Sequence, residues 1–249
     1  MPGGSFLRGK KEEQREEEKK TGRFLSEDAL RWMAALVIFA LVMAGSRQLS
    51  RFTGQEKIKR GNVEVMLDSG HGGSDPGKIG VNGEKEKEIN LQITQKIRQR
   101  LEEKNISVEL TKTNEEGTGK GKTEEMQERV KRINEIQPML TVSIHQNSYP
   151  DEEVKGAQTF YYTHSEASEK AARILQEALR KIDPENHRKS KANDTYYLLK
   201  RTKVPVVIVE CGFLSNPEEA RKLSEEAYQE KVAEAVTEGI LQCLREMEN

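Results

Sequence analysis

Cysteine is scarce in this sequence, and neither sign of charge prevails. The two cysteines, Cys211 and Cys243, are too few for a disulfide framework, so we expect two packed thiols whose redox state the sequence leaves open. The chain has 41 lysines and arginines against 42 aspartates and glutamates. The resulting net charge of −1 provides no overall basic field, and nucleic acid is therefore not an expected partner.

The chain also lacks an uncharged apolar run as long as the roughly 20 residues of an ordinary transmembrane helix. Residues 32–45 are apolar and flanked by arginines, which suits a signal anchor or the hydrophobic region of a signal peptide. The alternative is a buried core helix, but this stretch has no polar face. We expect residues 1–31 to form a charged cytoplasmic tail and residues 46–61 a linker. A modest excess of basic residues on the N-terminal side predicts an exported domain, with the anchor retained rather than cleaved after Ala44.

Histidine is rare as well, and two of the four histidines follow strand-like runs. Alternating apolar residues at 63, 65 and 67 predict a strand before a glycine-rich loop that carries His71. A second buried strand is expected at 139–144, and it ends at His145. Because functional groups gather at one edge of an open α/β sheet, we expect the two imidazoles to meet there as metal ligands. Taken singly, a histidine after a strand is more often a turn or capping residue.

Carboxylates occur where a metal site needs further groups. Residues 83–91 place glutamates at the start of a predicted helix, and the buried strand-like run 204–209 leads to Glu210. Two histidines and one carboxylate around an open position make up a hydrolytic zinc site. The ordinary alternatives are that the glutamates near residue 86 only form the charged first turn of a helix, and that Glu210 caps the turn after it.

Strand and helix patterns alternate through residues 62–249. Apolar stripes at helical spacing begin near residues 89, 126 and 232, and each is expected to pack in the core. Further strands are predicted at 108–111, 159–162 and 196–199. We therefore expect a single α/β domain with a twisted mixed sheet of about six strands and helices on both faces, preceded by the N-terminal apolar anchor.

Some conspicuous residues are expected to have no chemical role. The glycine- and lysine-rich tract 117–122 lacks the spacing of a phosphate-binding loop, and we interpret it as a surface turn. His164 and His187 lie in polar sequence and are expected to be exposed to solvent.

Five sequence blocks, in this order along the chain, resemble those of a known family. They are residues 70–77 (Gly-His-Gly-Gly-Ser-Asp-Pro-Gly), 86–91 (Glu-Lys-Glu-Ile-Asn-Leu), 128–130 (Glu-Arg-Val), 143–148 (Ser-Ile-His-Gln-Asn-Ser) and 205–217 (Pro-Val-Val-Ile-Val-Glu-Cys-Gly-Phe-Leu-Ser-Asn-Pro). From Val63 to about Leu244 the chain resembles the zinc-dependent N-acetylmuramoyl-L-alanine amidases of the type 3 family. These enzymes cut the bond between muramic acid and the stem peptide of peptidoglycan.

The resemblance implies a role for each of four residues. It assigns His71, Glu86 and His145 as zinc ligands and Glu210 as the catalytic acid and base. Zinc in such a set activates water for attack on the amide, and Glu210 then accepts the water proton and passes it to the leaving nitrogen. Beside these, Asn147 and Arg188 are expected to contact the substrate. In the resemblance, the stretch from Arg188 to Tyr197 borders the groove, and its basic and aromatic residues are expected to contact the glycan and the stem peptide.

Two departures from the family pattern bear on these assignments. The family block reads Glu-Lys-Asp-any-Asn-Leu, and the register of its Asn-Leu pair favours Glu86 as the ligand over Glu84 or Glu88. Glu88 stands where Asp is usual, and Glu84 begins a repeat of the same Glu-Lys dipeptide, so both remain alternatives. Cys211 stands where Leu or Val is more common.

A compact amidase domain behind a short apolar segment, without wall-binding repeats, resembles the sporulation-type amidases that act on spore cortex peptidoglycan. The expected function is therefore amide hydrolysis in cortex maturation, where it permits muramic lactam to form, and in germination. The expected location is the outer face of the cytoplasmic membrane or the cell wall, with the forespore intermembrane space as a further candidate. The sequence leaves open whether the domain needs an activating protein partner. The alternatives are a vegetative wall amidase, a zinc peptidase acting on stem peptides, and a catalytically silent, membrane-tethered wall-binding module.

Overall fold

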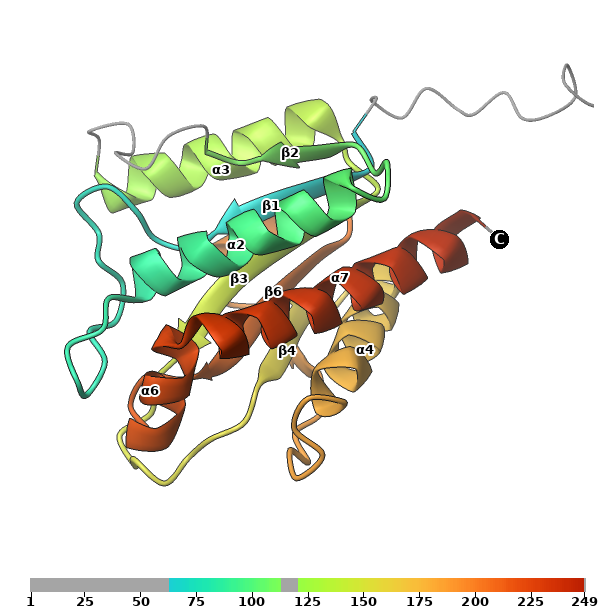
Figure 1. Ribbon diagram of the computed structural model, residues 1–249. Coiled ribbons are helices and arrows are strands. Elements are labelled where there is room, and N and C mark those ends of the chain that lie inside the picture. The colour runs from blue at the N-terminus through green and yellow to red at the C-terminus, as the bar shows by residue number, and fades with distance from the viewer. Residues whose placement is uncertain (1–62, 113–120, 249) are drawn as a thin grey trace, which may run out of the picture. The chain divides into compact units, whose positions relative to one another are not determined.

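The computed structural model describes residues 63–112 and 121–248, which are built around a six-stranded sheet (Figure 1). The strands are β1 (Val65–Ser69), β2 (Val108–Leu110), β3 (Leu140–Asn147), β4 (Gln158–Tyr162), β5 (Lys191–Asn193) and β6 (Val206–Phe213). Their order across the sheet is β2-β1-β3-β6-β4-β5. The sheet is mixed, because β4 runs antiparallel to β6 while the other neighbouring pairs are parallel.

The three strands that lead to the predicted site are neighbours in the middle of the sheet. β3 lies between β1 and β6 and is parallel to both, so the carboxyl ends of all three strands meet at one edge. All eight residues of β6 are buried, as expected for a strand covered on both faces. The expectation that the ends of the first and third strands lie side by side is confirmed by their direct pairing.

Helices cover both faces of the sheet. They are α2 (Glu86–Glu102), α3 (Lys122–Ile136), α4 (Glu166–Arg180), α5 (Tyr197–Arg201), α6 (Pro217–Ser224) and α7 (Glu226–Glu248). One core cluster joins α2, α4, α6 and α7 to the sheet, and a smaller cluster joins α3 and α5 to its other face. Figure 1 shows α2 and α7 side by side over the first face.

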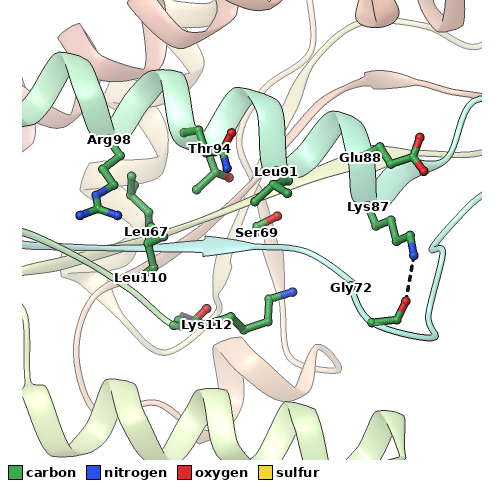
Figure 2. A pocket seen from close by; sticks show the side chains of 13 residues that line it. Leu67, Ser69, Gly72, Lys87, Glu88, Leu91, Thr94, Arg98, Leu110 and Lys112 are labelled. Atoms are coloured by element: carbon green, nitrogen blue, oxygen red, sulfur yellow. Dashed lines mark hydrogen bonds between the residues drawn. The ribbon is translucent and has the colours of Figure 1, made fainter. Parts of the chain in front are cut away.

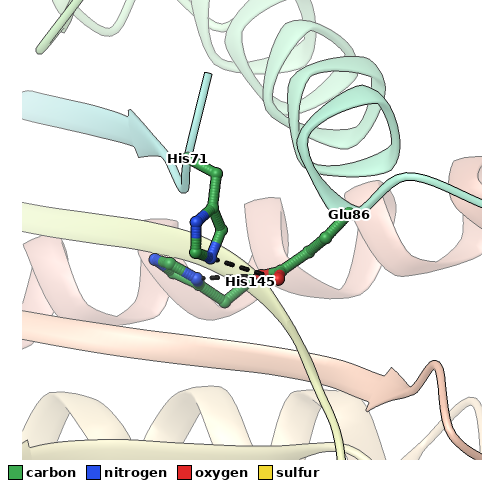
Figure 3. Close-up of side chains that lie close together, drawn as sticks. All are labelled: His71, Glu86 and His145. Carbon is green, nitrogen blue, oxygen red and sulfur yellow. Dashed lines mark hydrogen bonds and ion pairs between the residues drawn. The ribbon is translucent and has the colours of Figure 1, made fainter. Parts of the chain in front are cut away.

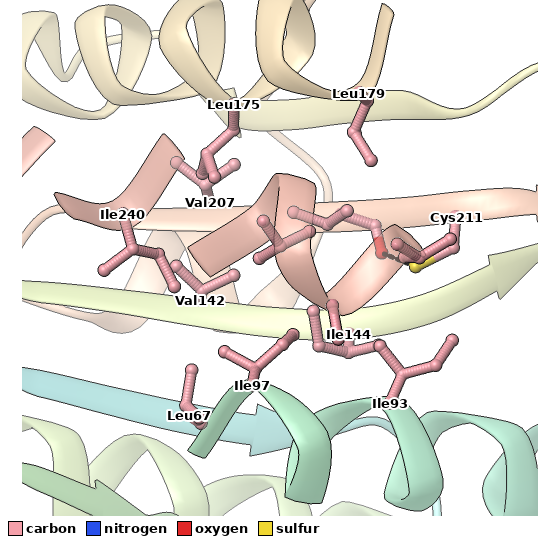
Figure 4. Packing of buried hydrophobic residues seen from close by; sticks show 14 of the residues in the cluster. Leu67, Ile93, Ile97, Val142, Ile144, Leu175, Leu179, Val207, Cys211 and Ile240 are labelled. Atoms are coloured by element: carbon pink, nitrogen blue, oxygen red, sulfur yellow. Dashed lines mark hydrogen bonds between the residues drawn. The ribbon is translucent and has the colours of Figure 1, made fainter. Parts of the chain in front are cut away.

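Periodic apolar residues explain the larger of these clusters. The stripe Ile89, Ile93, Ile97 and Leu101 on α2 is buried throughout, as its spacing of four residues predicts. Figure 4 shows Ile93 and Ile97 packed beside Ile144 of β3. This packing fixes α2 against the centre of the sheet, and its first residue is thereby held near the ends of β1 and β3.

One predicted strand is wrong. Residues 196–199 were expected to form a strand, but the chain forms α5 there, and the sixth strand is the earlier segment β5. Leu198 and Leu199 are both buried against the smaller core cluster, which a helical turn allows for consecutive residues. Short apolar runs do not distinguish a strand from a buried helix, and β5, a polar edge strand, has no apolar pattern to mark it.

The predicted charged tail at 1–31, signal anchor at 32–45 and linker at 46–61 lie outside the described residues. The same holds for most of the predicted surface turn at 117–122. Within residues 63–112 and 121–248, no helix is both long enough and apolar enough to cross a membrane.

Candidate metal site

His71 sits in a constrained loop directly after β1. Its φ angle of 61° is in the left-handed region, which non-glycine residues rarely adopt. Its carbonyl oxygen accepts a hydrogen bond from Arg129 Nη2 at 2.7 Å and another from Lys112 Nζ. Its ring Nδ1–H donates to Asp75 Oδ2 at 2.8 Å. These contacts fix the backbone and the ring orientation of His71, and they leave Nε2 directed at Glu86.

Glu86 is the first residue of α2, and its carboxylate lies between the two imidazoles (Figure 3). Oε2 is 3.1 Å from His71 Nε2, and Oε1 is 3.0 Å from His145 Nδ1. The backbone N–H groups of Lys78 and Gln146 donate to the same two oxygens at 2.8 and 3.1 Å. Each oxygen of this buried side chain is thus oriented by one main-chain donor and faces one histidine.

The three side chains form the one cluster in the described part of the chain that could hold a metal ion. One ligand atom from each of His71, Glu86 and His145 lies within 4.8 Å of the other two. The rings of His71 and His145 are nearly perpendicular, with centroids 5.1 Å apart. Two nitrogen ligands and one carboxylate are the donors of a three-residue catalytic site that leaves a position open. The donor set therefore fits a metal ion.

Glycines let the three groups approach one another. A Cβ atom on Gly70 would overlap the ring of His145, and one on Gly77 would lie 2.6 Å from Glu86 Oε2. Gly77 also has a φ angle of +70°, so a larger residue there would be strained as well as crowded.

The electrostatics of the cluster favour an ionised Glu86. Burial alone would raise the pKa of Glu86, but its hydrogen bonds and charge interactions with His145 and His71 outweigh burial and hold the pKa well below its usual value. Burial would lower the pKa of His71, yet hydrogen bonds to Glu86 and Asp75 raise it. Asp75 has its pKa lowered to about 2, because contacts with Lys122, His71 and the Gly77 N–H outweigh burial.

Glu210 projects from the neighbouring strand beside this cluster. It pairs with His145 in the register of β3 and β6, which places the two side chains on the same face of the sheet. Burial is the main cause that raises the pKa of Glu210 to about 7. The charge of His145 lowers this pKa, and the charge of Glu86 raises it. Its Oε2 atom is buried and has no hydrogen-bond partner among the described residues. A buried carboxylate oxygen without a partner is costly, which indicates that it meets a ligand, water or proton that arrives at the site.

A buried network beneath the His71 loop was not identified from the sequence. Asp68, on β1, accepts hydrogen bonds from Ser143 at 2.6 Å and Thr111 at 2.5 Å, and Arg129 Nη1 lies 3.6 Å from it. Burial would raise the pKa of Asp68, but Arg129 and these hydroxyls lower it to about 2. Arg129 thus joins Asp68 to the His71 carbonyl. The block at 128–130 pointed to this arginine without indicating its role.

The other glutamates near residue 86 have separate partners. Glu84 accepts hydrogen bonds from the backbone and side chain of Asn82, within a tight turn. Glu88 is exposed and forms an ion pair with Lys85 at 3.0 Å. The structure therefore brings Glu86, and neither alternative, to the histidines.

The two predicted substrate-binding residues lie outside the metal cluster. Asn147 ends β3, and its Oδ1 accepts a hydrogen bond from the Ser148 N–H. The guanidinium of Arg188 lies 4.7 Å from the centroid of the Phe213 ring and donates to Gln158, the register partner of Glu210. Both residues are therefore close in the fold to the ends of β3 and β6.

The remaining singled-out residues are accounted for by their surroundings. His164 and His187 are exposed, as predicted. Cys211 and Cys243 are buried and free, so the two thiols pack separately.

A cavity of about 670 Å³ lies on the other side of the His71 loop, between α2 and the strands β1 and β2. Figure 2 shows Lys87 and Lys112 at the end of this cavity near Gly72. Lys87 Nζ donates to the carbonyl of Gly73 at 2.8 Å, so both lysines support the backbone of the loop. His71, Glu86 and His145 do not line the cavity, and it is separate from the metal cluster.

Comparison with known proteins agrees with the geometry. Residues 65–242 match the family described as N-acetylmuramoyl-L-alanine amidase. The germination-specific N-acetylmuramoyl-L-alanine amidase of Bacillus subtilis is 33% identical over 230 residues, which cover 87% of this chain and 96% of the relative. AmiA of Escherichia coli, another N-acetylmuramoyl-L-alanine amidase, is 27% identical over 84% of this chain and 88% of its own length.

A solved structure gives the same assignment. The CwlD amidase from Clostridioides difficile, determined in complex with the GerS lipoprotein, superimposes with a TM-score of 0.67 and 38% identity. The match covers 73% of this chain and 98% of that structure. By the family match, the identity to these amidases and the shared fold, this chain belongs to the N-acetylmuramoyl-L-alanine amidase family.

Proposed function

We propose that this chain hydrolyses the amide bond between N-acetylmuramic acid and the L-alanine of the peptidoglycan stem peptide, using a metal ion held by His71, Glu86 and His145. The observation that carries the proposal is the convergence of these three side chains on one point, with the unpartnered Oε2 of Glu210 nearby. The family to which the chain belongs identifies the bond that is cleaved.

We propose zinc as the metal. Two imidazoles and one carboxylate match its preference for nitrogen and oxygen ligands in a four-coordinate site with one open position. When bound, zinc would supply Lewis acidity, which lowers the pKa of water at the site and polarises the carbonyl of the scissile amide. The Asp75 contact to His71 Nδ1–H would keep that ring in the tautomer whose Nε2 is free to coordinate.

Glu210 is proposed as the proton carrier. Its Oε2 is free to accept a proton from the attacking water and then to donate it to the departing alanine nitrogen. Burial places the pKa of Glu210 near neutrality, where one carboxyl group can serve in both steps. Its buried position also keeps the transferred proton away from bulk solvent.

We propose that Asn147 and Arg188 contact the substrate near the ends of β3 and β6, where both lie close to Phe213. Asn147 lies two residues beyond His145 on β3. Arg188 carries a positive charge next to the strand pair that holds Glu210, which suits a carboxylate of the stem peptide.

The biological setting is proposed to be the spore cortex, where removal of stem peptides permits muramic lactam to form before germination. The Bacillus subtilis relative is named for germination, and the Clostridioides difficile relative was solved with a lipoprotein partner. We accordingly propose extracytoplasmic action at the membrane or wall, with anchoring by residues 32–45 and an activating protein partner.

Three other functions use some of the same features. A vegetative wall amidase would have the same site and differ only in its substrate. A zinc peptidase would have the same ligands but cut within the stem peptide. A silent wall-binding module is disfavoured, because His71, Glu86, His145 and Glu210 are all present and close in the structure.

Mass spectrometry of digested peptidoglycan distinguishes these functions. The purified full-length chain would be incubated with zinc and with either cortex or vegetative peptidoglycan, and Glu210→Gln would serve as the matched control. Free stem peptides that begin with L-alanine, together with peptide-free glycan, would support the amidase. Cleavage between stem residues would identify a peptidase. If the zinc-loaded chain released no peptide even with a candidate partner present, the wall-binding module would be favoured.

A further inference from the structure

Tyr196 is an aromatic residue in a rigid position on the same face of the sheet as Glu210. The Oδ1 of Asn193 accepts hydrogen bonds from the backbone N–H groups of Thr195 and Tyr196, at 2.9 and 2.7 Å. This turn fixes the backbone immediately before α5. The Tyr196 ring then packs on Phe160 of β4, with centroids 5.6 Å apart.

The register of the sheet relates this ring to the proposed catalytic centre. Phe160 pairs with Ile208, and the next pair on the same face joins Gln158 to Glu210. A side chain packed on Phe160 therefore lies one same-face pair away from Glu210. In agreement, burial and the nearby Glu210 charge both raise the pKa of Tyr196, so its phenol keeps its proton at neutral pH.

The Tyr196 hydroxyl is also available to a ligand. It makes no hydrogen bond within the described residues, and the side chain is among their few exposed large hydrophobic groups, at 38%. A tyrosine with an apolar ring held by the protein and a free hydroxyl is suited to recognition, because the ring loses little entropy on binding. The adjacent Tyr197 is exposed to a similar extent, but its ring lies near the guanidinium of Arg201, 5.7 Å from the ring centroid, whereas the Tyr196 ring packs on Phe160.

We propose that Tyr196 is a substrate-positioning residue, whose hydroxyl donates a hydrogen bond to a peptide carbonyl of the stem that does not itself react. The inference rests on the proposed amidase function and names a contact within the same site. Since such a contact is made equally before and during the reaction, it lowers KM and leaves kcat unchanged.

The test compares Tyr196→Phe with Tyr197→Phe in the full-length, zinc-loaded protein. The substrate is a soluble disaccharide-peptide fragment of peptidoglycan. Phenylalanine keeps the packing on Phe160 and removes only the hydroxyl. We expect Tyr196→Phe to raise KM and the calorimetric Kd for the fragment about threefold to tenfold, with kcat, zinc content and Tm unchanged. Tyr197→Phe is expected to stay within about twofold of wild type.

Three results would contradict the proposals, and each has a different meaning. If the wild-type chain cleaves the fragment and Tyr196→Phe has the same KM and Kd, this inference is overturned while the amidase proposal stands. The inference also fails if Tyr196→Phe loses zinc or melts earlier, because the residue would then be structural. A zinc-loaded wild-type chain that neither binds nor cleaves the fragment would overturn the proposed function together with this contact.

Discussion

At the scale of single residues, the site depends on which polar atoms have hydrogen-bond partners. Both oxygens of Glu86 and the Nδ1 of His71 have assigned partners, whereas Glu210 Oε2 has none. Atoms with partners are held in place, and the one without a partner is available for proton transfer. The residues proposed as ligands and the residue proposed as proton carrier therefore differ in hydrogen bonding as well as in position.

Replacing Glu210 with Gln should remove activity without removing the metal. The amide has nearly the same shape as the carboxylate, but it cannot accept a proton from water. We expect kcat to fall by about 10²- to 10⁴-fold while zinc content stays at the wild-type level, as measured by steady-state kinetics and elemental analysis. Unchanged kcat would exclude Glu210 from the mechanism.

Asp68→Asn should destabilise the fold in a pH-dependent way. The pKa of Asp68 is about 2 in the folded chain against an ordinary 3.8, so its ionised form stabilises the fold. By linkage this contribution is about 2 kcal/mol above pH 4, and it is lost as the pH falls through 2. Urea unfolding should show a large difference between wild type and variant at pH 6 that shrinks towards pH 2. The exposed Asp194→Asn is the control, and an equal loss there would contradict the assignment.

At the scale of elements, the site is made by loops at the carboxyl ends of strands that pack closely. The His71 loop crosses the end of β3, and only a residue without a side chain fits at Gly70. Main-chain bonds such as Gly70 N–H to the Ile144 carbonyl, at 2.9 Å, keep this approach close. Site geometry is thus a property of two strands and the loop between β1 and α2.

Gly70→Ala is expected to disturb the metal site more than the fold. Its Cβ would overlap the His145 ring and force that ring out of its position. We expect zinc affinity to fall at least about tenfold, measured by competition with a chelator, alongside a stability loss of about 1–3 kcal/mol. Gly121→Ala is the matched control, because a Cβ there meets nothing within 4 Å. Wild-type affinity in Gly70→Ala would show that the ring can move without cost.

Sequence patterns predicted the helices and strands whose buried positions are occupied by apolar residues at regular spacing. β3 and β6 are buried runs, and α2 has a complete apolar stripe, so their existence and type followed from periodicity. β5 consists of Lys, Ala and Asn, and nothing in that composition marks a strand. The turn at Asn193, whose side chain redirects the chain into α5, is the signal that the interpretation of residues 196–199 missed.

The sequence pointed to the two histidines of the cluster more directly than to the residues that hold them in place. His71 and His145 are rare residue types at matching positions, whereas Asp75 and Arg129 are common types whose role depends on distance in space. Asp75 could have been found four residues after His71 in the same block. Arg129 reaches the His71 carbonyl across 58 residues of sequence, and no local pattern encodes that contact.

At the scale of the whole molecule, a large core holds the site at its edge. Leu175 on α4 is fully buried and belongs to the cluster that joins α2, α4 and α7 to the sheet. Leu175→Ala should lower the free energy of unfolding by about 2–5 kcal/mol, measured by urea denaturation, with zinc stoichiometry unchanged at 25 °C. The exposed Lys170→Ala on the same helix should cost less than about 1 kcal/mol. A comparable loss in both variants would mean that this core does not dominate stability.

We propose that one metal ion binds at His71, Glu86 and His145, which come from three different segments of the chain. The most direct test of this central claim is the zinc content of the full-length chain, determined by elemental analysis for wild type, Glu86→Gln and Glu88→Gln. We predict one zinc per chain in wild type and in Glu88→Gln, whose side chain is exposed and paired with Lys85, and almost none in Glu86→Gln. Full zinc occupancy in Glu86→Gln, or loss of zinc in Glu88→Gln, would show that Glu86 is not the carboxylate ligand.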